Sequence, residues 1–570
     1  MDSKCTTQAE RSNRLLDVAL CWHMHQPSYR TVDGEYRQPW VYLHAIKDYA
    51  DMAWHLENVE MARATVSFAP VLLDQLDDYA AQFASGIFRD GLLRALQRGG
   101  VDGESERRQL CYALCRANYE RMVRRFPAYE RLFHEAETAA WGGTPLSDKD
   151  LADTLVWYHL VWFGEATRRN DERIKSLIEK AGGFSEGDRQ TVLAVAGELV
   201  AGVTARYRAL AASGRVELSA SPYSHPILPL LIDFASAREA RPEMRLPASP
   251  RYPGGRERAG AQLLSARAAH AARFGAEPRG CWPSEGAISH ESMTALAAAG
   301  FSWAASGQAV LANSVRASAG DAGARSVHAP YVVHTDAGPI ACLFRDDDLS
   351  DRIGFIYAPL SADDALRDLC SALGAIADGA SQTGASVVTI ILDGENAWEH
   401  YPCNAFDFMQ DLYTRLGSHE RLRLTTVSAH LKRAQAPQTL ERVVAGSWVY
   451  GTLETWIGDE DKNRGWDLLC AAKLAFDESM RGATLSEAQR ARAEHALRQC
   501  ESSDWFWWFG GYNPPAPVRD FERLFRAHLH DLYAALGVPP PATLDLPVSI
   551  GTGADVYDGA MRRATKAPHA

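Results

Sequence analysis

A short apolar run that ends abruptly in polar side chains most constrains what this chain can fold into. Residues Val387–Leu392 are almost all β-branched or aliphatic, and such a run predicts a strand buried on both faces. The residues that follow include Asp393, Glu395, Asn396 and Trp398. An Asp-Gly pair alone would fit a solvated turn. A core strand that ends in carboxylates, an amide and an aromatic ring instead favours a parallel α/β protein with a site at the carboxyl edge of its sheet.

The same pattern of short apolar strands recurs along the chain and alternates with helical segments. Strands are predicted at 17–22, 64–68, 215–219, 279–282, 301–305, 340–345 and 422–427. This alternation predicts a parallel sheet, and seven or eight strands can close into a barrel. Polar residues follow several of these strands: His23 and His25, Glu217 with His225, Glu285, the Asp346–Asp348 run, and Asp393. We therefore expect one site on the carboxyl face of the barrel.

The helical periodicity divides the chain into three predicted parts. Residues 15–430 form the catalytic barrel, interrupted by a long helical insertion at about 72–213. Residues 431–540 are mainly helical, and residues 541–570 form a tail.

Composition excludes several classes of partner. The net charge of −12 argues against nucleic acid and anionic membranes. The first residues carry no apolar signal core, and no run is long enough to span a bilayer. Ten cysteines occur without a CxxC pair, so a reducing, cytoplasmic location is expected. The sequence does not predict the oligomeric state.

Two acids far apart in the sequence, Glu285 and Asp393, each follow a predicted strand and lie near a tryptophan. Cleavage of a glycosidic bond needs one carboxylic acid to protonate the leaving oxygen and one carboxylate to attack or stabilise the anomeric carbon. A parallel barrel can bring two strand ends close enough for that reaction. Burial and a neighbouring charge would raise the pKa of the acid, which would then keep its proton near neutral pH.

The residues leave other functions open. His23 and His25 point to the same side of a strand, as metal ligation needs, yet hydrogen bonds to substrate hydroxyls fit equally well. A metal-dependent polysaccharide deacetylase using His23, His25 and Asp393 is one rival, and a glucan-binding protein without catalysis is another. The acidic run at 346–351 fits a cation site, a sugar site, a helix cap or a solvated surface.

Taken together, five ordered segments resemble glycoside hydrolase family 57. They are His23–Pro27 (HMHQP), Gly214–Pro229 (GRVELSASPYSHPILP), Cys281–Ser289 (CWPSEGAIS), Leu392–Asn396 (LDGEN) and Gly446–Trp466 (GSWVYGTLETWIGDEDKNRGW). The resemblance implies a distorted (β/α)7 barrel and retaining chemistry on α-glucans without a metal or other cofactor. An adjoining helical domain would supply the fifth segment to the cleft.

The resemblance also assigns roles to individual residues. Glu285 matches the nucleophile and Asp393 the general acid/base. Positions expected to shape the donor subsite are matched by His25, Glu217, His225, Trp282 and Trp456. This favours substrate binding over metal binding for His23 and His25. Further substrate contacts are expected from Gln26, Glu395, Trp398, Trp448, Asp461 and Trp505, although core packing remains the default for any single tryptophan.

Within the family, the chain most resembles the hydrolytic members. Its end looks helical, and the SDWFWWFGG segment at 503–511 resembles the α-amylase and amylopullulanase branch. Hydrolysis of starch, glycogen or maltodextrin is therefore expected. Glucan transfer, by a 4-α-glucanotransferase or an α-1,4-glucan branching enzyme, is the alternative. Substrate names are loosely assigned within this family, which is also labelled α-amylase/α-mannosidase.

Overall fold

Seven parallel strands close into a barrel in the computed structural model, which describes residues 15–318, 325–434, 437–482 and 485–553. Around the barrel they follow the order β1, β2, β3, β4, β5, β7 and β8, and β8 pairs with both β1 and β7. Their bounds are β1 (Leu16–Met24), β2 (Ala64–Phe68), β3 (Val216–Ala220), β4 (Gly280–Cys281), β5 (Trp303–Gly307), β7 (Gly338–Arg345) and β8 (Val387–Asp393). The predicted (β/α)7 barrel is confirmed. Residues 1–14 and most of the predicted tail lie outside the described residues.

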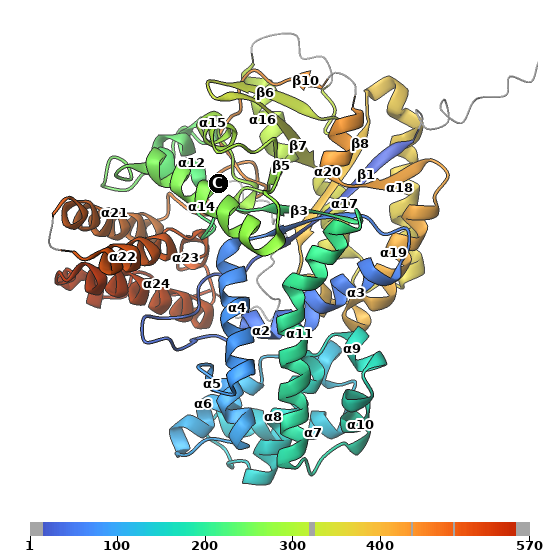
Figure 1. The fold of residues 1–570 in the computed structure, drawn as a ribbon, viewed down its shortest axis with the longest axis vertical. Coiled ribbons are helices and arrows are strands. Elements are labelled where there is room, and N and C mark those ends of the chain that lie inside the picture. The colour runs from blue at the N-terminus through green and yellow to red at the C-terminus, as the bar shows by residue number, and fades with distance from the viewer. Residues whose placement is uncertain (1–14, 319–324, 435–436, 483–484, 554–570) are drawn as a thin grey trace, which may run out of the picture.

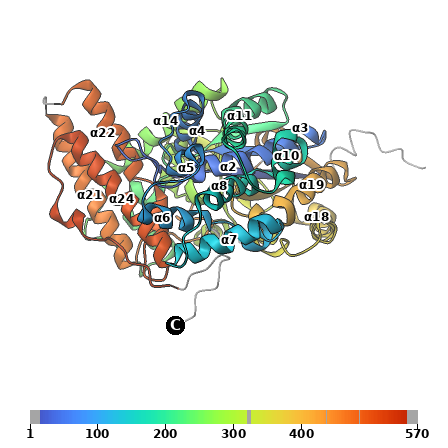
Figure 2. The same ribbon diagram turned by 90° about the horizontal axis from the view of Figure 1, so that it is seen from below.

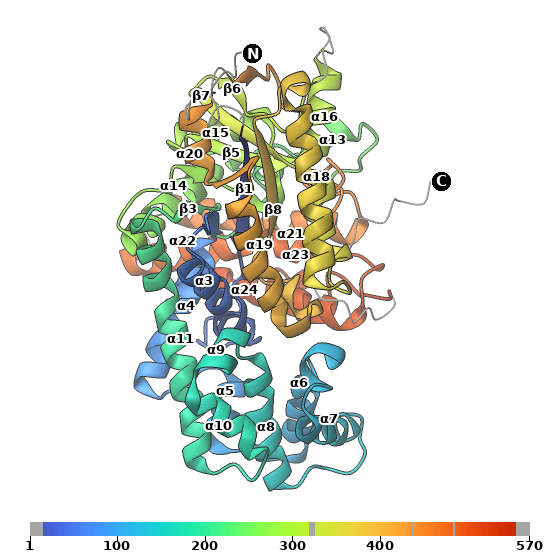
Figure 3. The ribbon, with the colours of Figure 1, turned by 90° about the vertical axis from the view of Figure 1, so that its right-hand side faces the viewer.

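The apolar run that begins at Val387 forms β8, which lies beside β1 (Figure 3). All nine residues of β1 are buried, as expected for a strand covered on both faces. Alternate residues of β1, Ala19 and Cys21, pack with Leu343 and Ile391 in a cluster separate from the main core. Because side chains alternate across a strand, this cluster fills the inside of the barrel.

Three further strands lie outside the closed ring. Strand β6 (Tyr331–Thr335), which the sequence reading missed, runs antiparallel to β7, and β10 (Gln438–Thr439) pairs with β6. Strand β9 (Leu422–Thr425), expected to be the last strand of the sheet, pairs only with β1. Nine residues make β1 long enough to pair with β9 through its amino half and with β2 through its carboxyl half.

The connection from β2 to β3 is helical and forms the lower part of the molecule in Figure 1. Ser185 caps its longest helix with a capping box. Its helices are α4 (Pro70–Ser85), α5 (Gly91–Arg98), α6 (Glu104–Leu114), η2 (Tyr119–Val123), α7 (Pro127–Ala140), α8 (Asp148–Trp162), α9 (Glu165–Asn170), α10 (Glu172–Lys180) and α11 (Glu186–Ala212). The shorter connection from β1 to β2 holds α2 (Trp40–His44), η1 (Ala45–Tyr49) and α3 (Ala50–Asn58).

The helices that follow β3 surround the barrel. Those before β8 are α12 (Leu228–Ile232), η3 (Phe234–Ser236), α13 (Ala237–Ala240), α14 (Gly255–Phe274), η4 (Ser284–Gly286), α15 (His290–Ala298), α16 (Gln308–Ala317), α17 (Asp347–Asp351), η5 (Arg352–Ile356) and α18 (Ala362–Thr383). After β8 come η6 (Trp398–His400), η7 (Pro402–Ala405), α19 (Phe406–Ser418) and α20 (Val427–Arg433).

The last helices form a group at one side of the barrel, at the left in Figure 2. They are α21 (Glu460–Arg481), α22 (Glu487–Cys500), α23 (Ser503–Trp508), α24 (Pro515–Leu536) and η8 (Ala542–Asp545). Aromatic packing joins them, with the rings of Trp466 and Phe506 stacked at 4.2 Å. Among the described helices, none combines the length and apolar character that crossing a bilayer requires. The proposed division into domains stays a prediction.

Candidate active site

Polar side chains from separate elements gather at the carboxyl ends of the barrel strands. His23 lies at the end of β1 and His25 just beyond it, while Asp393 is the last residue of β8. His225 follows β3, and Glu285 follows β4. In a parallel barrel these ends meet on one face. The register agrees, because His23 is paired with Asp393.

Glu285 is held in an unusual backbone conformation. Its φ of +58° lies in the left-handed region, which residues with a β-carbon seldom adopt. The residue is part of the short helical turn η4. The Nε1 of Trp448 donates to its Oε2 at 3.0 Å, and the Trp448 backbone N donates to its carbonyl at 3.1 Å. A bridge between Ile288 and Gly446 fixes the two segments together. The start of the Gly446–Trp466 segment therefore contacts the Cys281–Ser289 segment directly.

Asp393 has a different environment. Its Oδ2 accepts a hydrogen bond of 2.9 Å from Asn396. Burial raises its pKa to about 6, although the Asn396 bond and the charges of His25 and Arg345 act in the opposite direction. Asp393 is therefore poised to hold or release a proton close to neutral pH.

The two acids are coupled. Burial is the largest cause that raises the pKa of Glu285 well above its ordinary value, followed by the charges of Asp393 and Asp504. The hydrogen bond from Trp448 opposes this by favouring the ionised form. The two carboxyl groups therefore interact electrostatically, and ionisation of one disfavours ionisation of the other. The Glu285 side chain keeps 18% of its surface exposed, so it remains accessible.

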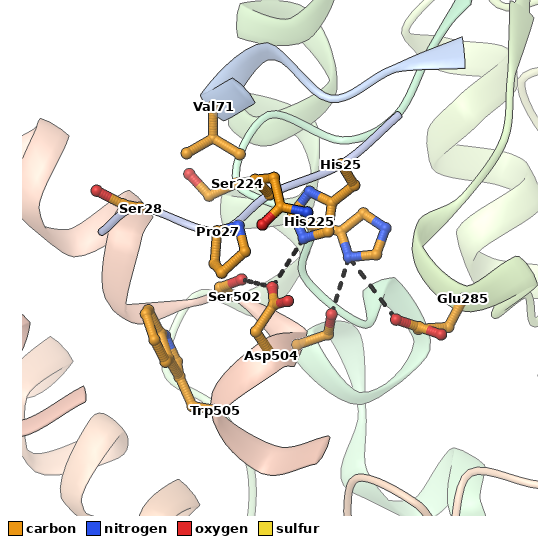
Figure 4. Close-up of polar contacts among 12 residues, drawn as sticks. His25, Pro27, Ser28, Val71, Ser224, His225, Glu285, Ser502, Asp504 and Trp505 are labelled. Carbon is orange, nitrogen blue, oxygen red and sulfur yellow. Dashed lines mark hydrogen bonds and ion pairs between the residues drawn. The ribbon is translucent and has the colours of Figure 1, made fainter. Parts of the chain in front are cut away.

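His23, His25 and His225 form a stacked group beside Glu285, and Figure 4 shows His25 and His225 of this group. The Nε2 atoms of His23 and His225 are 3.1 Å apart, and the rings of His25 and His225 lie 3.8 Å apart. The Nδ1 of His225 lies 2.9 Å from the Ser503 hydroxyl and 4.0 Å from Oε1 of Glu285. Burial lowers the pKa of His23 and His225 well below the ordinary value. Both rings are therefore neutral and able to accept and donate hydrogen bonds.

Asp504 on α23 completes the group, and the sequence reading missed it. Its Oδ2 lies 2.9 Å from Nε2 of His25 and accepts from the Ser502 hydroxyl at 2.6 Å (Figure 4). The sequence did contain a signal, since Asp504 stands beside Trp505 in the SDWFWWFGG segment that resembles the hydrolytic branch. The prediction selected the aromatic ring, whereas the carboxylate is the residue that reaches the site.

His25, His225 and Asp504 could together hold a metal ion, because one ligand atom from each lies within 4.8 Å of the others. This trio differs from the set predicted for a metal-dependent deacetylase, which included His23 and Asp393. His23 instead contacts His225, and Asp393 contacts Asn396.

Trp282 lies in the group, as predicted. Its ring is 6.5 Å from the His23 ring and 5.3 Å from the Trp448 ring. Its Nε1 is buried without a hydrogen-bond partner in the described part of the chain. An unpartnered buried donor at a site of this kind is available to a ligand.

Glu395 and Gln26 lie beneath the histidines and bind each other. Oε1 of Glu395 accepts hydrogen bonds from the backbone N of His25 at 3.1 Å, from Gln26 Nε2 at 3.2 Å and from the Tyr49 hydroxyl at 3.2 Å. Both side chains are buried. They therefore fix the backbone that carries His25.

Glu217 lies near the amino end of β3, where its side chain contacts Trp303 and Ser428. Its Oε1 accepts from Trp303 Nε1 at 2.9 Å, and its Oε2 accepts from the backbone N of Ser428 at 2.7 Å. Trp303 begins β5, and Ser428 follows β9. Glu217 is three residues from the end of β3, or about 10 Å at the usual rise. The strand pattern did not show which end its side chain serves.

The side chains of four other residues predicted to contact substrate instead contact other protein groups in this structure. Trp398 packs on Trp22 and donates to the Gly394 carbonyl, and Trp505 donates to the Gln499 carbonyl within the helical core. Trp456 is buried against Trp507. Asp461 accepts from the Ser549 hydroxyl at 2.8 Å and pairs with Arg464.

The acidic run at 346–351 forms ion pairs within the protein. Asp346 caps α17 and lies 2.8 Å from Nε2 of His328. Asp347 and Asp351 both bind Arg345, and Asp348 binds Arg352. A helix cap was among the predicted alternatives; the pairing with Arg345 was not.

Comparison with known proteins gives one family and one fold. The model of "Glycosyl hydrolase family 57" matches residues 19–443. No curated protein matches the chain in sequence.

Three solved structures share the fold at low sequence identity. The α-amylase AmyC from Thermotoga maritima has a TM-score of 0.56 at 13% identity, with 92% of this chain and 93% of that chain covered. A GH57-type branching enzyme from Pyrococcus horikoshii has a TM-score of 0.57 at 14% identity, covering 95% and 99%. TK1436, a GH57 branching enzyme from Thermococcus kodakaraensis, has a TM-score of 0.54 at 14% identity, covering 96% and 100%.

Proposed function

The chain belongs to glycosyl hydrolase family 57, and from this premise we propose that it cleaves α-glucans with retention of configuration through Glu285 and Asp393. Membership makes the chain an enzyme of the glycoside hydrolase class, which includes members that transfer sugars. The observation that carries the proposal is the coupling of the two acids. The charge of Asp393 raises the pKa of Glu285, so ionisation of one acid disfavours ionisation of the other, which supports a site with one protonated and one ionised carboxyl group.

The double displacement requires one protonated and one ionised carboxyl group. With the proton on Asp393, the Glu285 carboxylate is the nucleophile, and Trp448 Nε1 stabilises its negative charge. Asp393 protonates the glycosidic oxygen while Glu285 attacks the anomeric carbon, which gives a covalent glycosyl-enzyme and a free chain end. Asp393 then takes a proton from the acceptor, the acceptor oxygen attacks the anomeric carbon, and Glu285 leaves as a carboxylate.

The histidine group is suited to hold the sugar at the cleavage point. Neutral imidazoles, the Asp504 carboxylate and the buried Trp282 indole can bind hydroxyl groups, and the indole face can cover a sugar ring. Because Asp504 lies on α23, the C-terminal helices supply part of this site. Hydrogen bonds to fixed donors and acceptors orient the anomeric carbon relative to Glu285.

We favour water as the acceptor, hence an α-amylase or amylopullulanase type of activity. The chain remains helical through η8 in its described C-terminal part, and the segment carrying Asp504 resembles the hydrolytic branch. Structural neighbours titled as an amylase and as branching enzymes share the fold, so chain transfer is the second candidate. Acceptor choice depends on how well the site excludes water and positions a second sugar.

Product analysis from maltoheptaose tests the proposal. Only shorter sugars indicate hydrolysis, longer linear sugars indicate transfer to a 4-hydroxyl, and branched products indicate transfer to a 6-hydroxyl. Glu285→Ala should abolish turnover, and Asp393→Asn should impair substrates with poor leaving groups most. Near-normal rates in Glu285→Ala, or no turnover of any α-glucan by the wild type, would overturn the proposal.

A further inference from the structure

Arg345 links the two halves of the catalytic pair, although no motif contains it. It is the last residue of β7 and is only 5% exposed. Its Nε donates a hydrogen bond of 2.8 Å to the carbonyl of Ile391, on the neighbouring strand β8. Ile391 stands two residues before Asp393, so Arg345 is attached to the strand that carries the acid.

The guanidinium group is held in place by the acidic run. One of its terminal nitrogens lies 3.0 Å from Oδ1 of Asp347, and the other lies 2.7 Å from Oδ1 of Asp351. Both acids lie on α17, directly after β7. A planar guanidinium bound at all three nitrogens has a fixed orientation, which an ammonium group would not have. This gives the acidic run a specific task.

The guanidinium also lies over the indole of Trp448, with 5.3 Å between its central carbon and the ring centroid. Trp448 is the residue whose Nε1 donates to Glu285. A cation over an indole is attracted to the ring face and restricts its movement. Arg345 therefore contacts the strand of the acid on one side and the hydrogen-bond donor of the nucleophile on the other.

We propose that Arg345 is a positioning residue that sets the placement of Trp448 relative to Asp393, and that Asp347 and Asp351 hold it in this role. The inference rests on the proposed function of Glu285 and Asp393. Arg345 acts through Trp448 and through its charge, and it does not touch the substrate.

The charge of Arg345 also acts on Asp393. His25 just beyond β1 and Arg345 on β7 favour the ionised form of Asp393, and the charge of Asp504 on α23 disfavours it. Glu285 on η4 and Glu395 in the loop after β8 are both coupled to Asp393, and whenever either of them ionises, its charge acts in the same direction as that of Asp504. Loss of Arg345 removes one of the two favourable charges and leaves Asp347 and Asp351 unpaired. Asp393 then keeps its proton to higher pH.

The test compares Arg345→Gln with Arg352→Gln. Arg352 is the matched control, because it is bound by Asp348 and Asp368 on the outside of the same segment. Arg345→Gln should lower kcat roughly tenfold or more with little change in KM, as expected when positioning is lost. It should also move the basic limb of the kcat/KM profile upward by about half a pH unit. Arg352→Gln should change neither quantity.

A purely structural role would lower the amount of folded enzyme and leave the pH limb in place, and that result would overturn the inference. Arg345→Lys keeps the positive charge but loses the planar guanidinium group that binds through three nitrogens. It should therefore lower kcat and leave the basic limb of the kcat/KM profile near the wild-type position. If Arg345→Gln does not fold, a wild-type kcat in Arg345→Lys would overturn the inference. If the wild type cleaves glucans and Glu285→Ala does not, while Arg345→Gln matches Arg352→Gln, the inference alone fails and the proposed function stands.

Discussion

The indole nitrogen of Trp448 donates a 3.0 Å hydrogen bond to the Glu285 carboxylate, although 163 positions separate the two residues. The backbone N of Trp448 also donates to the Glu285 carbonyl. The contact joins the segment after β4 to the loop that precedes the C-terminal helices. The predicted nucleophile is therefore oriented by a residue from another part of the chain.

Replacing Trp448 by phenylalanine should remove this bond and keep most of the ring. The bond lowers the pKa of Glu285, so its loss should raise that pKa further and move the acid limb of the kcat/KM profile to higher pH. A hydrogen bond to a charged group contributes about 2 kcal/mol, which predicts a roughly 30-fold loss in kcat/KM. Trp157→Phe is the control, because its Nε1 donates to the Ala181 carbonyl in the helical insertion. An acid limb that moves equally in both variants would contradict this account.

Glu395→Gln should be nearly silent at neutral pH. Burial and the charge of Asp393 raise the pKa of Glu395 well above its ordinary value, which favours the protonated form of the side chain. Glutamine can offer one oxygen to the same three donors, from His25, Gln26 and Tyr49. We expect kcat/KM within about threefold of the wild type, whereas Glu395→Ala leaves three donors unpaired and should cost more. Equal losses in both variants, measured at pH 7, would show that the negative charge is needed.

Asp17→Asn should destabilise the amino end of the barrel. Asp17 is buried on β1, and burial alone would raise its pKa, but bonds from His430, Arg423 and Arg433 lower the pKa to about 2. The carboxylate therefore contributes stability at neutral pH that is lost as the pH falls from about 4 through about 2. Breaking such a buried pair costs about 3 kcal/mol.

Urea titrations of the wild type and Asp17→Asn give the size of that contribution. The difference in unfolding free energy should be largest above about pH 5 and should shrink as the pH is lowered below about 4. Asp520→Asn serves as the control, since Asp520 binds Gln38 in a partly exposed contact. A difference between wild type and Asp17→Asn that stays constant with pH would refute the assignment.

Much of the fold could be predicted because the strands of a closed parallel barrel are apolar along their whole length. The run beginning at Val387 was recognisable for this reason, and so was the strand at 17–22. Strand β6 was missed because it lies outside the ring and is only partly buried, with His334 exposed. The local pattern of Leu422–Thr425 showed a strand, but the length of β1 decides that it pairs outside the ring.

The placement of His23, Glu285 and Asp393 could be predicted because each lies at or shortly beyond the carboxyl end of a strand. Glu217 shows the limit, because alternation fixes the face of a strand and leaves open which end of the barrel the side chain serves. Trp505 shows another, since an aromatic ring beside a carboxylate packs into the core as readily as it binds sugar. Arg345 and Asp504 act only through contacts made by distant segments, and no local pattern contains that information.

The stereochemistry of azide products tests the central claim most directly. In Glu285→Ala, azide should attack an activated α-glucosyl substrate in place of the missing carboxylate and give the β-glucosyl azide. In Asp393→Ala, azide should attack the glycosyl-enzyme on Glu285 and give the α-glucosyl azide. Opposite anomers from the two variants are the predicted result. The same anomer from both variants, or wild-type hydrolysis by either of them without azide, would contradict the assigned roles.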